Sequence, residues 1–191
     1  MSTNRIEELS QLLKSKLGDH ILTLVEEKGE LVLVIERKGA SRIFQILKED
    51  KDLNFKFLSS ITAVDWLDKK DFRFEVVYHL MNLSKFYRLR VKVAVPEEDA
   101  AVETVLPLWA SADFLESEVW DMFGIQFRGN PDVRRMLMYS EFEGHPLRKD
   151  YPVQGKQPRV QFRSPEVRNT AEDMIRSDLI QINKKKGEAR V

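Results

Sequence analysis

The three histidines are the first residues to consider as catalytic or metal-binding groups. His20, His79 and His145 lie too far apart to form a local zinc motif, in which two histidines sit one helical turn apart. The chain has no cysteine, which excludes disulfides, thiolate zinc sites and iron–sulfur clusters held by its own thiolates. The nearest approach to a phosphate-binding loop, Gly124 to Gly129, is followed by Asn130 where lysine is needed, and no serine lies in a GxSxG turn. The sequence therefore predicts no catalytic, cofactor-binding or metal-binding residue in this chain.

Three acids close together form a second candidate, because three carboxylates can bind a divalent cation. On a helix, Glu118 and Asp121 lie about 60° apart, whereas Glu116 points about 140° to 160° away from them. One helix cannot direct all three toward one ion, so we interpret them as solvated or ion-paired acids. Their candidate partners are the cations that follow: Arg134, Arg135, Arg148 and Lys149.

The apolar residues of the same stretch cover more than one face of a helix. Four of them between Leu115 and Phe123 share an arc of about 100°, which suits packing on a core. Trp120 lies about 60° beyond Phe123, and Phe114 lies on the opposite flank. Two interpretations stay open: the helix is buried on several sides within its own domain, or it lies between this domain and a partner chain.

The residues that follow this helix favour a partner. Gly124 to Pro146 contain five glycines or prolines, and neither the helical nor the strand period continues there, which predicts loop or extended structure to residue 158. Such a long irregular segment is uncommon in a compact domain unless it is functional or packs on another molecule.

Hydrophobic periodicity predicts the elements that position these residues. The predicted helices cover 6–17, 42–47, 102–109 and 112–123, and the predicted strands cover 21–25, 31–35, 59–66, 72–79 and 87–95. This order predicts the α+β class, as a two-layer domain with helices packed on a mixed, mainly antiparallel sheet, followed by an extended C-terminal segment. We expect one domain at 1–152 and a tail at 153–191 that is first extended and then helical from Ser164 to Lys186.

Charge is balanced over the chain but not along it. Lys and Arg total 31, as do Asp and Glu, so no overall field selects polyanions. The tail holds nine basic and five acidic residues, a net charge of +4, which leaves a small nucleic-acid-binding protein as an alternative from another class. A free-standing hydrolase or decarboxylase that uses Asp121 or His145 is a third hypothesis. The longest apolar run, Leu31 to Ile35, is far shorter than a membrane span of about 20 residues, so we expect a soluble, cytoplasmic chain.

Three stretches of the sequence carry a family resemblance. Residues 116–127 read ESEVWDMFGIQF, residues 129–138 read GNPDVRRMLM, and residues 141–152 read EFEGHPLRKDYP. Their order and spacing resemble the signature of the C subunit, the 30 kDa subunit family, of proton-translocating NADH:quinone oxidoreductase, respiratory complex I. The family commonly has arginine, histidine and tryptophan at the positions of Ser117, Asn130 and Phe142. Related membrane-bound hydrogenases and other quinone-linked complexes carry a similar subunit, and they remain an alternative.

The resemblance implies a cofactor-free, non-catalytic subunit in the peripheral arm of the enzyme, on the cytoplasmic side of the cell membrane. Its implied partners are the D-type large quinone-site subunit and the B-type subunit with the terminal iron–sulfur cluster, with neither nucleic acid nor a membrane span of its own. Iron–sulfur clusters, FMN and quinone would belong to partner subunits, which transfer electrons from NADH to quinone and translocate protons.

The resemblance also implies which residues bind partners. They lie on the signature from its helix to its last proline: Glu118, Trp120, Asp121, Phe123, Gly124, Arg134, Arg135, Gly144, His145, Pro146, Arg148, Lys149, Asp150 and Pro152.

Overall fold

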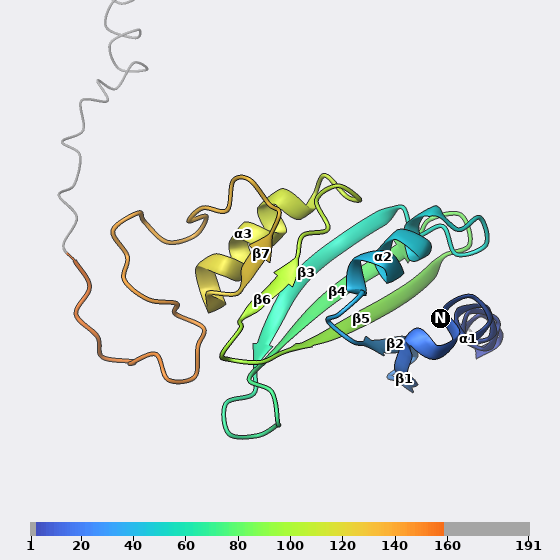
Figure 1. Ribbon diagram of the computed structural model, residues 1–191, viewed down its shortest axis with the longest axis horizontal. Helices are drawn as coiled ribbons and strands as arrows, with labels where there is room; N and C mark the ends of the chain where they lie inside the picture. The colour runs from blue at the N-terminus through green and yellow to red at the C-terminus, as the bar shows by residue number, and fades with distance from the viewer. Residues whose placement is uncertain (1–2, 159–191) are drawn as a thin grey trace, which may run out of the picture. The chain divides into compact units, whose positions relative to one another are not determined.

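The computed structural model describes residues 3–158 of the 191-residue chain (Figure 1). A division of the chain into two units falls after Gln157, and every helix and strand named here belongs to the first unit. In chain order the elements are α1 (Thr3–Leu17), the 3-10 turn η1 (Gly18–His20), β1 (Ile21–Glu27), β2 (Glu30–Ile35), α2 (Ala40–Glu49), β3 (Phe57–Asp65), β4 (Phe74–Asn82), β5 (Tyr87–Val95), β6 (Ala101–Glu103), α3 (Ala112–Phe123) and β7 (Gln126–Arg128).

Five strands form the main sheet in the order β1-β2-β5-β4-β3. Every neighbouring pair is antiparallel except β2 and β5, which run parallel with Leu33 opposite Val91. The short strands β6 and β7 form a separate parallel pair. The predicted α+β class with a mixed, mainly antiparallel sheet is therefore confirmed.

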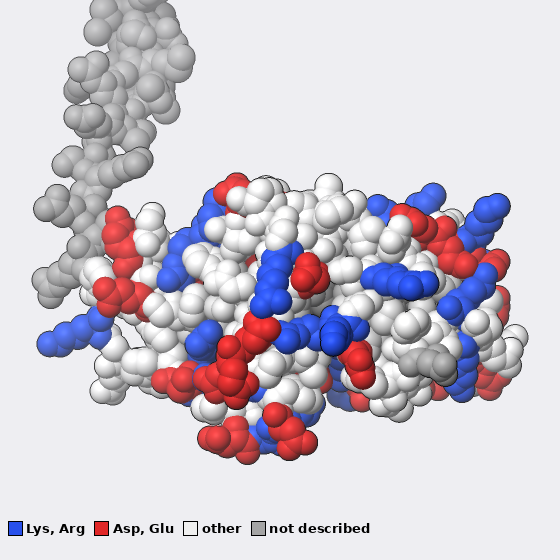
Figure 2. All heavy atoms as spheres, viewed as in Figure 1, with Lys and Arg blue, Asp and Glu red and all other residues white. Residues whose placement is uncertain are grey.

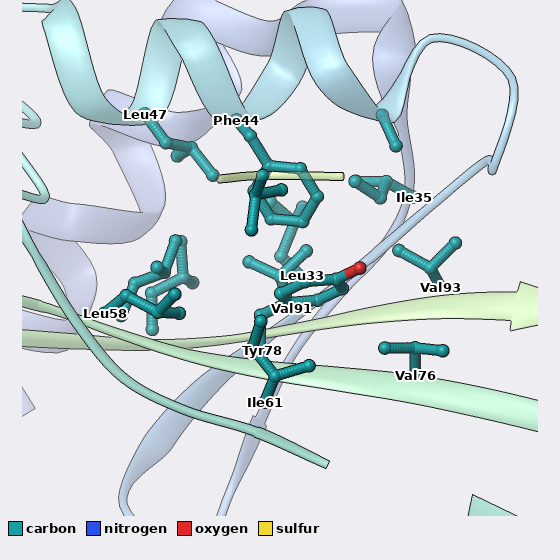
Figure 3. Close-up of a cluster of buried hydrophobic side chains, with 14 of the residues drawn as sticks. Leu33, Ile35, Phe44, Leu47, Leu58, Ile61, Val76, Tyr78, Val91 and Val93 are labelled. Carbon is teal, nitrogen blue, oxygen red and sulfur yellow. The ribbon is translucent and has the colours of Figure 1, made fainter. Parts of the chain in front are cut away.

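The helices cover one face of this sheet because each has an apolar stripe. In α2, Ile43, Phe44 and Leu47 recur at helical spacing and are buried. Figure 3 shows Phe44 and Leu47 pointing from the helix toward the side chains of the sheet, where the rings of Phe44 and Tyr78 have centroids 4.6 Å apart. The buried residues of α1 and α3 join the same hydrophobic cluster, so one core holds all three helices on the sheet.

The predicted helix at 102–109 is wrong. Val102 lies in β6 and pairs with Phe127 of β7, a strand that the sequence pattern did not predict. The helical spacing reflects a single turn, in which the Trp109 N–H bonds to the Val105 carbonyl at 2.9 Å. Pro107 has no N–H for a longer helix.

Two further sequence predictions concern the tail and the membrane. The predicted tail helix at 164–186 lies outside the described residues. Between residues 3 and 158, no helix combines the length and the apolar character that a membrane crossing requires.

Acidic and basic side chains are interspersed on the face shown in Figure 2.

Candidate docking segment around the end of the third helix

The C-terminal end of α3 needs hydrogen-bond donors, because the last carbonyls of a helix have no partner within it. Gly124 follows the helix in the left-handed conformation, with φ of 74°, and its N–H bonds to the Trp120 carbonyl at 2.8 Å. The other donors come from residues 129–152, which we call the capping segment.

The capping segment caps the carbonyls of three successive residues of α3. The bonds are His145 Nδ1 to the Asp121 carbonyl at 3.0 Å, Leu147 N–H to the Met122 carbonyl at 3.1 Å, and Arg148 Nε to the Phe123 carbonyl at 2.6 Å. The guanidinium of Arg148 also lies at the negative end of the helix dipole, where a cation is stabilising. The irregular segment is thus held in place by the helix that precedes it.

The carboxylate of Asp121 organises the middle of the segment. It has no exposed surface, and its Oδ2 accepts the successive N–H groups of Met136, Leu137 and Met138 at 3.0, 2.8 and 3.0 Å. Its Oδ1 accepts a bond from Arg135 Nη1 at 2.8 Å. Burial opposes ionisation, but the Arg135 guanidinium and the three amides outweigh it, so the pKa of Asp121 lies below its usual value.

Arg135 ties both halves of the segment to this carboxylate. Besides Asp121, its guanidinium donates to the Gly144 carbonyl at 3.0 Å and the Phe142 carbonyl at 2.7 Å. It also lies 5.4 Å from the ring centroid of Trp120, within cation–π range. Gly144 has φ of 86°, a conformation that favours glycine and turns the chain back toward α3.

His145 packs against the turn that ends α3. A carbonyl only accepts, so the bond to Asp121 places the proton on Nδ1. A Cβ added to Gly124 would lie 2.6 Å from the ring atoms Cδ2 and Nε2 of His145, and 2.5 Å from Nη2 of Arg148. Burial, together with the positive charges of Arg148 and Arg135, lowers the pKa of His145 below its usual value.

Asp65 at the end of β3 and Arg73 just before β4 hold the far end of the segment. The buried carboxylate of Asp65, at the end of β3, accepts the Lys149 N–H at 2.8 Å. The buried guanidinium of Arg73 bonds to Asp150 at 2.6 Å, lies 3.4 Å from Asp65, and also pairs with Glu97. The sequence analysis missed Asp65 and Arg73, because their partners in the capping segment lie more than 75 positions away and no local pattern marks them.

The solvated or ion-paired interpretation of the acidic cluster is wrong for Glu116. Its side chain is fully buried and accepts bonds from Val105 N–H at 2.8 Å, Thr104 Oγ1 at 2.7 Å and Asn130 Nδ2 at 2.9 Å. Burial raises the pKa of Glu116 against the effect of these donors. The angles between the three acids show only where each one points along the helix. They could not show that α3 is packed on several sides, which buries Glu116. Asp121 is ion-paired as expected but buried, and Glu118 is exposed.

Several of the predicted partner-binding residues come together at the end of α3: Trp120, Asp121, Phe123, Gly124, Arg135, Gly144, His145 and Arg148. Others lie apart from this cluster. The Arg134 side chain is exposed and pairs with Asp132, the side chains of Lys149 and Pro152 are exposed, and Pro146 is half-buried. Contact of any of these residues with a partner stays a prediction.

Apolar side chains of this region also point outward. Leu137 is 61% exposed and Leu147 is 52% exposed, although the N–H groups of both are fixed to α3. In the part of the chain that the structure describes, no three His, Asp or Glu side chains are grouped to hold a metal ion.

Comparison with known proteins gives a consistent family. Residues 33–157 match the family model described as the 30 kDa subunit of respiratory-chain NADH dehydrogenase. The chain is 44% identical over 143 residues to the C subunit of NADH-quinone oxidoreductase from Geobacter sulfurreducens, covering 75% of this chain and 87% of that protein. It is 41% identical over 154 residues to the corresponding protein of Paramagnetospirillum magneticum, covering 80% and 76%.

Two solved structures share the fold. A trypsin-resistant fragment of Nqo5 superposes with a TM-score of 0.59 at 36% identity, covering 65% of this chain and 98% of the fragment. A chain of the membrane-bound sulfane sulfur reductase, an archaeal respiratory membrane complex, superposes with a TM-score of 0.67 at 27% identity, covering 78% and 86%.

Proposed function

This chain belongs to the 30 kDa subunit family of respiratory-chain NADH dehydrogenase, and we propose that it is a cofactor-free, non-catalytic subunit of the peripheral arm. In this role it supports the quinone-reducing module, while other chains transfer electrons from NADH to quinone and translocate protons. The proposal places the subunit on the cytoplasmic side of the cell membrane, bound through its neighbours.

The observation that carries the non-catalytic role is the use of the reactive side chains in the capping segment. Asp121, Arg135, His145 and Arg148 each bond to main-chain groups that hold the segment on α3. A general acid or base must reach a substrate proton, whereas the carboxylate of Asp121 is saturated with donors and has no exposed surface. These residues therefore act on the shape of the protein, and the same argument weighs against a hydrolase or decarboxylase.

The proposed partners are a large quinone-site subunit and the subunit that carries the terminal iron–sulfur cluster. Because the chain has no cysteine, thiolate-held iron–sulfur clusters would belong to such neighbours, and the proposal assigns FMN and quinone to them as well. The outward Leu137 and Leu147 give the capping segment apolar surface for a protein contact.

Copurification tests this function. A tagged copy expressed in its own host should recover the flavin- and cluster-bearing subunits, and the recovered complex should oxidise NADH with quinone. The purified chain alone should contain neither iron nor flavin and should show no such activity. Activity of the isolated chain at the rate of the complex would overturn the non-catalytic role, and recovery of no other subunit would overturn membership in a complex.

The fold shared with the archaeal sulfane sulfur reductase favours a second candidate. In that case the chain is the equivalent subunit of a related membrane-bound complex with another electron donor or acceptor. The same copurification distinguishes the two, because only the first complex contains a flavin-bearing subunit and oxidises NADH with quinone.

A further inference from the structure

The capping segment has an unusual means of support. The structure assigns no helix or strand to residues 129–152, so their main-chain N–H groups lack the partners that regular structure supplies. Three successive N–H groups, those of Met136, Leu137 and Met138, instead share one carboxylate oxygen of Asp121. Arg135 neutralises the same carboxylate. One buried side chain thus determines the path of the main chain across the end of α3.

We propose that Asp121 is a positioning residue for subunit docking: its carboxylate folds the capping segment before a partner binds and so holds Leu137 and Leu147 outward, against an apolar surface of a larger subunit of the same complex. This inference rests on the proposed function. It assigns the internal role to Asp121 and the direct contact to two leucines.

The geometry of the leucines supports this assignment. The Leu137 N–H bonds to Asp121 Oδ2 at 2.8 Å, and the Leu147 N–H bonds to the Met122 carbonyl at 3.1 Å. Both leucines are therefore attached to consecutive residues of one helix, while their side chains are 61% and 52% exposed. A single exposed leucine is ordinary. Two leucines on a main chain that is already fixed by folding provide contact area, because little further conformational entropy of the main chain is lost when a partner binds.

The charges between the leucines indicate the chemistry of the partner. Residues 138–146, between the two leucines, contain the exposed carboxylates of Glu141 and Glu143 and no lysine or arginine, while exposed Arg134 and Lys149 lie just outside this stretch. Among the described residues, neither carboxylate is within ion-pair distance of a cation. A complementary surface is apolar where it meets the leucines and carries lysine or arginine beside them.

The test compares matched variants of the full chain by two measurements, amide exchange in the isolated protein and recovery of the chain in the purified complex. Asp121→Asn removes the charge at nearly constant shape, and Glu118→Gln is the exchange control on the exposed side of the same helix. The double variant Leu137→Ser with Leu147→Ser probes the contact. Its control is Leu22→Ser with Leu83→Ser, which changes leucines that are 55% and 56% exposed elsewhere.

We expect Asp121→Asn to accelerate exchange at residues 136–138 by about tenfold, equivalent to about 1.4 kcal/mol, while exchange in β4 and β5 accelerates by no more than this factor. Recovery in the complex should fall by a similar factor. The Leu137 and Leu147 variant should keep normal exchange and lose recovery, whereas both controls should keep normal exchange and the leucine control should also assemble normally. If Asp121→Asn does not fold, Arg135→Gln is the second variant: it leaves the buried carboxylate without its cation and removes the bonds to the Phe142 and Gly144 carbonyls, so exchange in the segment should again be faster and recovery should fall.

Unchanged exchange at 136–138 would overturn the positioning role, as would faster exchange with normal recovery. Normal assembly of the Leu137 and Leu147 variant would overturn the contact, and so would self-association of the isolated chain that this variant abolishes. Failure of the wild-type chain to recover any other subunit would instead refute the proposed function, while the exchange result would still decide whether Asp121 organises the segment.

Discussion

Replacing Gly124 with alanine tests the packing at the end of α3 directly. The residue has φ of 74°, and for a residue with a side chain this conformation costs about 1–2 kcal/mol. The new Cβ would also lie 2.5–2.6 Å from Arg148 and His145, so both side chains must move. Losing the charged bond from Arg148 to the Phe123 carbonyl costs a further 1.5–3 kcal/mol or so. We expect Gly124→Ala to lower the free energy of unfolding by about 3–4 kcal/mol.

Urea denaturation measures this loss, and Gly29→Ala provides the control. Gly29 has a similar φ of 79°, but a Cβ there would meet nothing within 4 Å, so its cost should be only the conformational one of about 1–2 kcal/mol. Losses that agree within about 0.5 kcal/mol for the two variants would refute the close packing of His145 and Arg148 on Gly124.

Three further predictions concern the buried charges. Arg73→Met leaves the Asp65 carboxylate buried without its cation and should lower the free energy of unfolding by about 3–5 kcal/mol. Asp150→Asn changes the half-exposed partner of Arg73 and should cost under about 1 kcal/mol. Similar losses for the two variants in urea denaturation would contradict this difference. Because the pKa of Asp121 is depressed in the folded chain, its stabilising effect is complete above its ordinary value of 3.8 and is lost as the pH falls through the lower folded-state value. The stability advantage of wild type over Asp121→Asn should therefore be about 1.4 kcal/mol at neutral pH, as the tenfold change in exchange implies, and shrink in acid, and an advantage that grows in acid would reverse the assignment. Glu116 is the opposite case: its raised pKa stabilises the folded chain at low pH, an effect that is lost as the pH rises past its ordinary value of 4.5. Glu116→Gln should accordingly gain stability relative to wild type as the pH rises above 4.5, and denaturation curves that show no such gain would argue against a raised pKa of Glu116.

The strands of the main sheet and the helices packed on it were predictable, because their apolar residues recur at clear strand or helix spacing. Alternation from Tyr87 to Val95 gave a strand whose inward side chains are all buried. The prediction of a helix at 102–109 was wrong because the three-residue strand β6 is too short to show a period, and the apolar residues of the turn after it have helical spacing.

The candidate site was predictable only in part. The Asp121–Arg135 pair was among the ion pairs expected from the sequence, whereas partner binding by the signature residues stays a prediction. Periodicity gave no sign that Asp65 and Arg73 reach the end of the capping segment, since these contacts join residues far apart in the chain. The burial of Glu116 was also missed, because its donors Thr104 and Asn130 come from loops on either side of α3.

The parallel pairing of β2 with β5 constrains the order of events during synthesis. Residues 36–86 must leave the ribosome before β5 begins at Tyr87, so the hairpin of β1 and β2 emerges long before the strand that completes its side of the sheet. Pairing between distant strands slows folding, and the edge of β2 that pairs with β5 stays without its partner in the meantime. Translation pauses before Val95 should therefore expose an unpaired strand edge and promote aggregation of the nascent chain.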